Sequence, residues 1–360
     1  MPTTCVKSPT SRLNSGYASR DITPPISIYH RMWGAARHDA ATGVHRPLQV
    51  DVVVLEPRGG DPTQRLVRVQ LDFVHLSNDQ HDRLIAPVAA AAAVAPAQVI
   101  VTHSHSHSAG LYDPNRRDLP GGELIAPYLD ELNAKAAATT TAAVSTLADA
   151  TITYATGQCN MAANRDYYDA EQGIYTTGYN PDHPIENTLV IGRVTDPAGA
   201  TRLILVNYAC HPTTLAWDNT LLSPDFVGGL RETIERNQHA PCCFYQAPCG
   251  DLGPKDGFVG DTAIADSNGQ QVGHAALSAL YGMGAPQTDF AYIGPVVSGA
   301  TIGTWGRRPH DEDRTSETAV FAGDTFEVAL DLIDLPTVAD LQNQLEQYTT
   351  EQEAADARND

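Results

Sequence analysis

Three histidines alternate with serines in the segment T-H-S-H-S-H-S-A-G at residues 102–110. This segment follows the apolar run Q-V-I-V-T at residues 98–102, which predicts a buried strand. Side chains two residues apart lie on one face of a strand, so the spacing predicts that His103, His105 and His107 point the same way. Three imidazoles on one face are typical of a metal site or an acid–base cluster. A polar, solvated strand end is the alternative interpretation.

A further histidine, His211, also ends a β-rich run, in the sequence N-Y-A-C-H-P-T-T at residues 207–214. Pro212 prevents the strand from continuing, because proline cannot donate a ladder hydrogen bond. The layout repeats that of the first segment, and open α/β sheets bind ligands at the carboxyl ends of their strands. This favours a functional role for His211. Histidines from two strand ends alone would be an incomplete catalytic zinc set, which usually has three protein ligands.

A third segment, Q-A-P-C-G-D-L-G-P at residues 246–254, contains Asp251 between glycines. Glycine allows a tight turn and a close backbone approach. Asp251 is predicted either to orient a ligand histidine or bind metal, or only to cap the turn. Cys249 is a candidate nucleophile on the pattern of Cys–His chemistry, although no neighbouring residue predicts a lowered thiol pKa. Arg165 is either positioned to polarise a carbonyl or is a surface arginine.

The composition excludes several classes of partner. Among 360 residues, 43 are acidic and 23 are lysine or arginine, which gives a net charge of −20. This balance disfavours nucleic acid and anionic membrane surfaces as ligands. The six cysteines form no C-x-x-C pair, so we expect free, buried thiols in a reducing compartment. The first residues lack the apolar segment of a secretory signal, and we therefore expect a cytoplasmic protein.

The order of predicted elements indicates an α/β fold, which we expect to form one domain over residues 1–360. Strands are predicted at residues 50–55, 66–73, 98–102, 187–195, 202–208, 243–246 and 326–332. Helices are predicted at residues 79–95, 127–149 and 225–238, within 259–281, and in the polar stretch after Pro336.

Taken together, these motifs resemble those of the neutral (non-lysosomal) ceramidase family and its bacterial relatives. The similar segments occur in the family's order: G-Y-A-S-R-D-I-T-P-P at 16–25, G-V-H-R-P-L at 43–48, S-H-S-H-S at 104–108, N-R at 164–165, H-P-T at 211–213, S-P-D-F-V-G at 223–228 and G-D-L-G-P at 250–254. The resemblance implies a layered α/β sandwich, with mixed β-sheets flanked by helices. It also implies a zinc-dependent hydrolase of amide bonds.

The resemblance also implies roles for individual residues. It makes His105 and His211 zinc ligands, places His107 beside the metal against substrate or the activated water, and aims Arg165 at the substrate carbonyl. His103 has no counterpart in the family. Gly253 stands where ceramidases have a serine, so we do not expect ceramide itself as substrate. The predicted site comprises His107, Arg165 and Asp251 as catalytic residues, Asn164 and Gly253 as substrate-binding residues, and His105 and His211 as metal ligands.

Two more zinc ligands of the family, a glutamate and a tyrosine near a P-G-E turn, have no match here, because this sequence contains no P-G-E. The triplet D-L-P at residues 334–336 resembles the stretch that precedes that segment. A polar tail, expected to be helical, follows at residues 341–360. We therefore expect a second polypeptide, either a C-terminal subunit or a processed fragment, to complete the metal site. A shortened sequence is the alternative.

The sequence thus favours a zinc-dependent hydrolase that cleaves an amide, lactam or ester bond of a small molecule or oligomer through a metal-activated water. One alternative is a metal-free cysteine amidase that uses Cys249 and a histidine. Another is a non-catalytic subunit of a hetero-oligomeric hydrolase. Metal analysis with chelator inhibition separates the first two, and a metal-free chain without amidase activity would favour the third.

Overall fold

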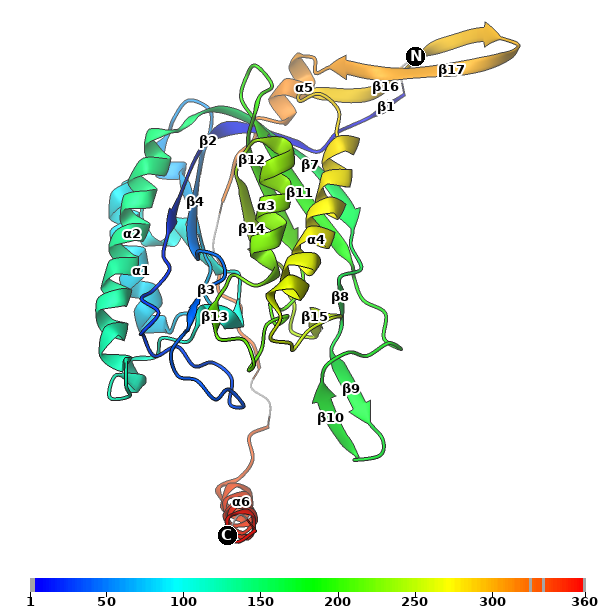
Figure 1. The fold of residues 1–360 in the computed structure, drawn as a ribbon. Coiled ribbons are helices and arrows are strands. Elements are labelled where there is room, and N and C mark those ends of the chain that lie inside the picture. The colour runs from blue at the N-terminus through cyan, green and yellow to red at the C-terminus, as the bar shows by residue number, and fades with distance from the viewer. Residues whose placement is uncertain (1–3, 324–325, 332–333, 359–360) are drawn as a thin grey trace. The chain divides into compact units, whose positions relative to one another are not determined.

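The computed structural model describes residues 4–323, 326–331 and 334–358. The chain divides into two compact units, residues 1–323 and 324–360. The first unit is built on an eight-stranded mixed sheet (Figure 1). In sheet order its strands are β14 (Cys242–Gln246), β12 (Thr201–Tyr208), β11 (Thr188–Thr195), β7 (Ala148–Gln158), β2 (Thr10–Asp21), β4 (Gln49–Glu56), β5 (Leu66–Leu71) and β6 (Val99–His103).

The sheet curls so that its two ends meet, since β14 contacts both β5 and β6. Val53 on β4 packs in one buried cluster with Leu203 on β12 and Tyr245 on β14, between the two halves of the sheet. The outer faces are covered by helices, α1 (Asn78–Ala92) and α2 (Ile125–Ser145) on one half and α3 (Phe226–Gln238) and α4 (Thr262–Gly282) on the other. The expected layered α/β sandwich with mixed sheets and flanking helices is therefore confirmed.

Alternation along β4 explains how one strand serves two layers. Its sequence Q-V-D-V-V-V-L-E places Val50, Val52 and Val54 against α1 and α2, whereas Val53 faces the other half of the sheet. Both faces are buried, and β-branched side chains suit such a strand. The two outermost pairs of the sheet, β5–β6 and β12–β14, are parallel, and the remaining pairs are antiparallel.

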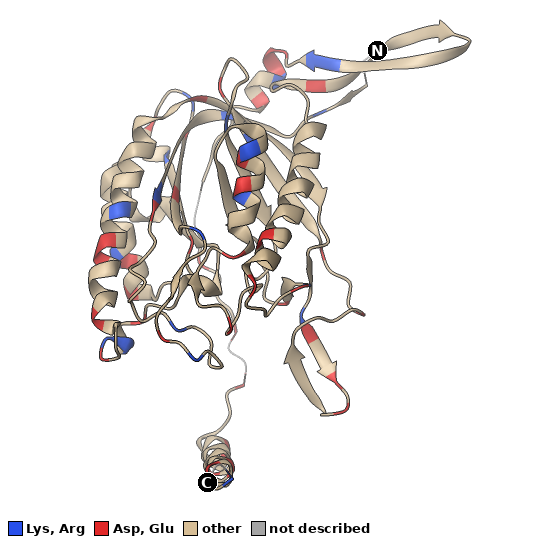
Figure 2. Ribbon diagram, in the orientation of Figure 1, with Lys and Arg blue, Asp and Glu red and all other residues tan. Residues whose placement is uncertain are grey.

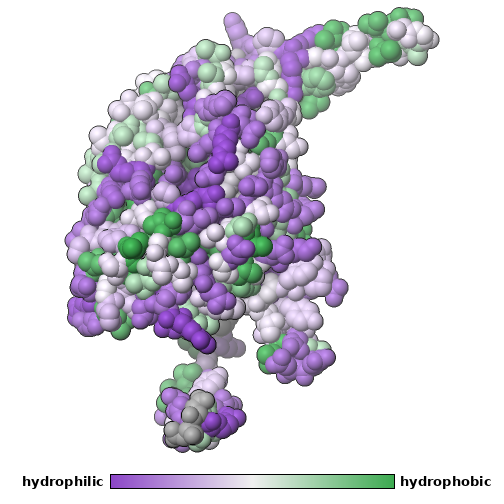
Figure 3. All heavy atoms as spheres, viewed as in Figure 1, coloured by the Kyte–Doolittle hydropathy of each residue, from purple (hydrophilic) through white to green (hydrophobic). Residues whose placement is uncertain are grey.

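Smaller elements complete the first unit. Short pairs are formed by β3 (Gly43–Val44) with β13 (Leu221–Leu222), β8 (Ala162–Asn164) with β15 (Leu252–Pro254), and β9 (Asp166–Asp169) with β10 (Ile174–Thr177). A three-stranded sheet contains β1 (Cys5–Val6), β16 (Thr288–Ser298) and β17 (Ala300–Pro309), and α5 (Glu312–Glu317) follows it. Hairpin β16–β17 extends away from the large sheet and carries exposed apolar residues (Figure 3).

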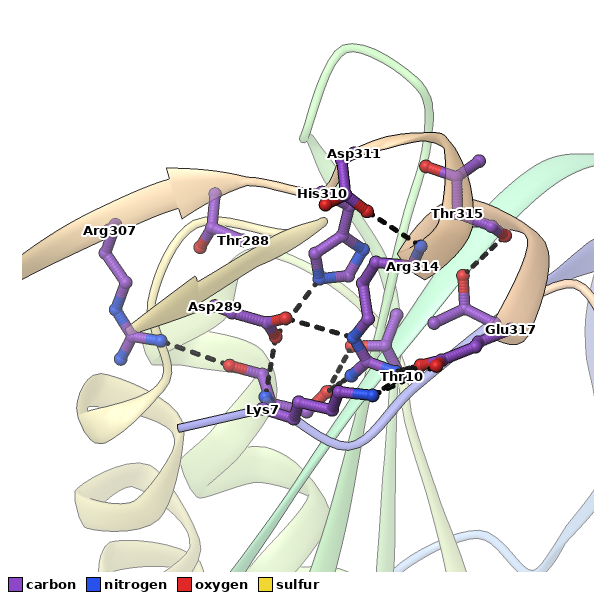
Figure 4. A network of polar contacts seen from close by, with 12 residues as sticks. Lys7, Thr10, Thr288, Asp289, Arg307, His310, Asp311, Arg314, Thr315 and Glu317 are labelled. Atoms are coloured by element: carbon purple, nitrogen blue, oxygen red, sulfur yellow. Dashed lines mark hydrogen bonds and ion pairs between the residues drawn. The ribbon is translucent and has the colours of Figure 1, made fainter. Parts of the chain in front are cut away.

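A polar network fastens this hairpin to the N-terminal segment (Figure 4). Asp289 on β16 accepts hydrogen bonds from the Ser8 amide at 2.8 Å and from Arg314 Nε at 3.0 Å. Lys7 forms an ion pair with Glu317 at 2.7 Å between Nζ and Oε2. These contacts join segments from the two ends of the first unit. Acidic and basic residues are otherwise spread over many elements (Figure 2).

The second unit contains α6 (Val338–Asp356), which Thr337 and Asp340 begin with a reciprocal capping box. The polar helix expected after Pro336 is thus present. The prediction of a strand at residues 326–332 is wrong, because residues 326–331 lie in no strand. The last residue of that range, Leu332, falls outside the described residues. The apolar side chains of Phe326, Val328 and Leu330 are exposed, so the alternation of apolar residues in this segment does not mark a buried face. Among the described residues, no helix is both long enough and apolar enough to cross a bilayer.

Candidate metal centre

Three histidines meet just beyond the carboxyl ends of β6 and β12. The ligand atoms of His105, His107 and His211 all lie within 4.8 Å of one another. The ring centroids of His105 and His211 are 4.7 Å apart, and that of His107 is 5.1 Å from His105 and 5.7 Å from His211. Within the described part of the chain, this is the one group of three or more His, Cys, Asp or Glu residues close enough to share a metal ion.

The histidines of the first segment do not share a strand face, so that prediction is wrong. Strand β6 ends at His103, and His107 begins a single 3-10 turn (His107–Ala109). Between them, His105 adopts a left-handed backbone conformation with φ of 66°. This turn brings His105 and His107 together and leaves His103 outside the cluster. Burial, followed by the neighbouring His75 and His105, lowers the pKa of His103 to about 4.

His105 and His211 are oriented in the same way. The Nδ1 atom of His105 lies 2.7 Å from the carbonyl oxygen of Val74, and that of His211 lies 2.8 Å from the carbonyl oxygen of Cys249. A carbonyl only accepts hydrogen bonds, so Nδ1 carries the hydrogen and Nε2 is the bare nitrogen of each neutral ring. Metal-binding histidines typically have such a backbone or carboxylate acceptor on the other ring nitrogen.

His107 lies in a different environment. Both of its ring nitrogens are buried, and neither has a hydrogen-bond partner among the described residues. Burial, followed by the charges of His105 and His211, lowers the pKa of His107 to about 3. Burial also lowers the pKa values of His105 and His211. All three rings are therefore neutral near pH 7, which is the protonation state that binds metal. Nitrogen donors in this form fit a zinc ion.

A buried ion pair supports the backbone that orients His105. Arg231 of α3 donates to the carboxylate of Asp72, and this carboxylate also accepts from the Gln49 amide at 3.0 Å. Asp72 directly precedes Phe73, whose carbonyl accepts the His105 amide at 2.9 Å. The next carbonyl, that of Val74, is the one that orients the ring of His105.

The loop of His107 is joined to the loop of His211 and to the segment before α3. The amide of His107 donates to the carbonyl of Pro212 at 3.3 Å. The Ser106 hydroxyl donates to the Ser223 carbonyl at 2.8 Å, and the Ser223 amide donates to the Ser108 carbonyl at 3.1 Å. These contacts fix the three imidazoles relative to one another, although the histidines come from distant parts of the sequence.

Arg165 directly follows β8, at the end of the β8–β15 pair. Its amide donates to the Asp251 carbonyl and its Nε donates to the Gly250 carbonyl, each at 3.0 Å. No terminal guanidinium nitrogen has a hydrogen-bond partner among the described residues, so these donors are available to a ligand. The positive charge of Arg165 contributes to the lowered pKa values of all three clustered histidines.

The remaining predicted site residues lie near Arg165 but contribute differently. Asp251 is exposed, and its carboxylate is not part of the histidine cluster. The Cys249 carbonyl, rather than Asp251, orients His211. The Asn164 side chain is buried and accepts from the Asp166 amide at 3.0 Å, at the base of hairpin β9–β10. A Cβ atom at Gly253 would lie 3.7 Å from the Arg165 Cβ, so a serine at this position meets ordinary contacts.

Solved structures that are similar to this chain include two ceramidases. One is a ceramidase complexed with C2, with a TM-score of 0.62 and 17% sequence identity. The other is the neutral ceramidase from Pseudomonas aeruginosa, with a TM-score of 0.60 and 19% identity. The chain has a neutral ceramidase-like fold. The match covers 82% of this chain in both cases.

The fold implied by the resemblance of the motifs is therefore confirmed. This chain spans about half the length of both ceramidase structures, 50% and 51% respectively. No family model matches the chain, and no curated protein matches it in sequence. The assignment of site residues therefore rests on the local geometry described above.

Sequence reasoning missed an aromatic group within the neutral ceramidase-like fold. The ring of Trp33 lies 5.1 Å from that of His107, measured between centroids. Trp217 and Phe258 lie 6.0 Å and 5.9 Å from Trp33. None of the three belongs to a recognisable motif. The available signal was that Trp33 and Trp217, two of only three tryptophans, occur in segments without regular periodicity.

Proposed function

We propose that this protein is a zinc-dependent hydrolase of amide bonds, with His105 and His211 as metal ligands and His107 beside the metal. The observation that carries the proposal is the matched orientation of His105 and His211. Each neutral ring donates from Nδ1 to a backbone carbonyl and keeps Nε2 bare. The neutral ceramidase-like fold supports amide hydrolysis over other zinc chemistry.

A zinc ion bound there would lower the pKa of a water molecule and polarise the carbonyl of the substrate. The chain's own residues supply the other requirements. His107 is neutral and has two unpartnered ring nitrogens, so it can hold the water by a hydrogen bond at one of them. Arg165 can donate from its terminal nitrogens to the substrate carbonyl, with Nε fixed by Gly250.

The substrate proposed is an amide, lactam or ester in a small molecule or oligomer. The net charge of −20 disfavours anionic polymers. The absence of a side chain at Gly253 removes the hydroxyl that ceramidases have at that place, so the proposal does not extend to ceramide. Asn164 and Asp251 remain predicted members of the substrate-binding and catalytic sets, with no direct contact to the histidines among the described residues.

Completion of the metal coordination by a second polypeptide is part of this proposal. Two carbonyl-oriented imidazoles are fewer than the three protein ligands of a usual catalytic zinc site. We propose that oxygen ligands from another chain complete the site, and the alternative is that His107 becomes the third ligand. Native mass spectrometry of the purified material decides between these, because a stable complex with a second chain appears directly as added mass.

The test of the function is reversible metal dependence. The protein is dialysed against a chelator, assayed by mass spectrometry on a panel of small amides, lactams and esters, and reloaded with zinc. We expect hydrolysis to disappear on chelation and to return with zinc, whereas His274→Ala, at an exposed position on α4, behaves like the wild type. Chelator-resistant hydrolysis would favour the cysteine amidase. A protein that neither binds zinc nor cleaves the panel would favour the non-catalytic subunit.

A further inference from the structure

Three aromatic side chains from separate loops form a continuous surface next to the histidine cluster. We name Trp33, Trp217 and Phe258 the aromatic wall. Trp33 meets Trp217 edge-on at 6.0 Å between ring centroids and meets Phe258 edge-on at 5.9 Å. The rings of Trp217 and Phe258 are close to parallel, with 21° between their planes and 6.4 Å between centroids.

The aromatic wall is in direct contact with the candidate metal centre. Trp33 lies 5.1 Å from His107 between ring centroids. His107 in turn lies 5.1 Å from His105 and 5.7 Å from His211. The wall therefore runs from His107 through Trp33 to Trp217 and Phe258.

The backbone of Phe258 is held in a costly conformation. Its φ is 58°, in the left-handed region that bulky residues rarely adopt. The Phe258 amide donates to the Thr213 carbonyl at 3.0 Å, and the Val259 amide donates to the Thr214 carbonyl at 2.8 Å. Both acceptors closely follow His211 in the chain. Strain of this kind persists where surrounding contacts impose it, often at ligand sites. Here it fixes an aromatic ring relative to a predicted metal ligand.

The outer side of the wall is open. Trp217 has 36% of its surface exposed, although it is a large aromatic side chain. A hollow of about 580 Å³ lies against it, lined by Ala35, Arg37, His38, Trp217, Asp218 and Thr220. The indole nitrogen of Trp33 is buried without an acceptor among the described residues. The Trp217 side chain is thus partly accessible to a ligand.

We propose that the aromatic wall is a subsite that binds a planar, apolar ring of the substrate, on one side of the scissile amide. The placement relative to the amide rests on the proposed function, whereas ring binding itself does not. A ring gains specific aromatic contacts beyond the area that it buries, and a linear alkyl chain gains only burial. The substrate class is therefore an amide that carries an aromatic ring rather than a long alkyl chain.

The first experiment measures binding without turnover. Phenylacetamide and hexanamide are titrated separately into the protein and followed by ligand-observed NMR, in the wild type and in Trp217→Ala. We expect Trp217→Ala to weaken phenylacetamide binding about 3- to 10-fold and to change hexanamide binding less than about twofold. Trp217→Phe keeps a ring and should stay within about twofold of the wild type. Trp305→Ala, on β17, is the matched control at a similarly exposed tryptophan and should change neither affinity.

The second experiment compares hydrolysis of the N-methylamides of phenylacetic and hexanoic acid, of which only the first carries a ring. We expect Trp217→Ala to lower kcat/KM for the phenylacetyl compound and to spare the hexanoyl compound. Equal losses for the two amides in binding, or no loss for phenylacetamide, would overturn the subsite. An equal effect of Trp305→Ala would do the same. If phenylacetamide binds as expected and neither N-methylamide is cleaved, the subsite stands and the proposed amidase activity is contradicted.

Discussion

The imidazoles of His105 and His211 lie 4.7 Å apart between ring centroids, and each donates from Nδ1 to a backbone carbonyl. The two residues come from different loops, yet they present the same tautomer and the same bare nitrogen. The acceptors, Val74 and Cys249, are main-chain atoms and so do not depend on side-chain identity. The proposed assignment of both residues as metal ligands rests on this equivalence.

Removing either ring should abolish metal binding. We expect His105→Ala and His211→Ala each to weaken zinc binding by more than about 100-fold, beyond the range typical of losing a residue that only hydrogen-bonds to a ligand. Both residues lie in loops at the ends of strands, so the fold should be retained. Zinc content after dialysis checks the first statement, and circular dichroism checks the second. Stoichiometric zinc in both variants would show that the ligand assignment is wrong.

Cys249→Ala should keep at least about a tenth of the wild-type activity, because a bystander thiol contributes only packing. Burial raises the pKa of the Cys249 thiol, which leaves it protonated and weakly nucleophilic at neutral pH. The measurement is the turnover number of the zinc-loaded variant. A complete loss of turnover in a folded, zinc-loaded protein would support the cysteine amidase instead.

Arg231→Ala should destabilise the protein strongly, by about 3–5 kcal/mol in the free energy of unfolding, because it leaves buried carboxylates without a partner. Arg231 pairs with Asp72 and lies 3.6 Å from Asp51, both buried. Arg236→Ala, on the same helix, is the matched control. Its pair with Glu232 is exposed, so its loss should cost less than about 1 kcal/mol. Urea unfolding of both variants measures the difference, and equal costs would contradict the role given to Arg231.

Parts of this fold followed from the sequence because burial and periodicity agree there. The valine-rich run of β4 and the apolar strand β6 were predicted close to their observed bounds. The prediction of a strand at residues 326–332 was wrong, because an apolar pattern indicates a strand only where a partner strand is available. The strands β2 and β7 were missed, since their many small and polar residues lack a clear period.

The candidate site was anticipated in its residue types and not in its geometry. His105 and His107 meet because the chain turns through a left-handed His105, which strand alternation does not predict. The acceptor for His211 is a carbonyl, and backbone acceptors leave no trace in side-chain motifs. The aromatic wall was also missed, because three separate loops contribute one ring each and no single motif contains them.

The stability of the protein should fall in mild acid, partly through His30. Burial, followed by the charge of His38, lowers the pKa of His30 to about 4, against about 6.5 in an unfolded chain. Between these values the unfolded state binds a proton that the folded state excludes. The contribution of His30 is therefore fully present above pH 6.5 and is lost as the pH falls towards 4, by up to about 1.4 kcal/mol per pH unit.

The His30→Gln variant tests this pH dependence. Its free energy of unfolding should decline less between pH 7 and pH 4.5 than that of the wild type, whatever its value at pH 7. His274→Gln, at an exposed position, should follow the wild type. Denaturant unfolding at a series of pH values measures these slopes. Identical slopes in His30→Gln and the wild type would mean that His30 does not contribute.

The central claim is that His105 and His211 hold a zinc ion through Nε2, with His107 beside it. Anomalous diffraction at the zinc absorption edge, from crystals grown with zinc, locates the ion directly. We expect a single strong peak about 2.0–2.1 Å from Nε2 of both His105 and His211. In His211→Ala crystals the peak should be absent. A peak on other residues, or no peak between these two nitrogens in the wild-type protein, would contradict the account.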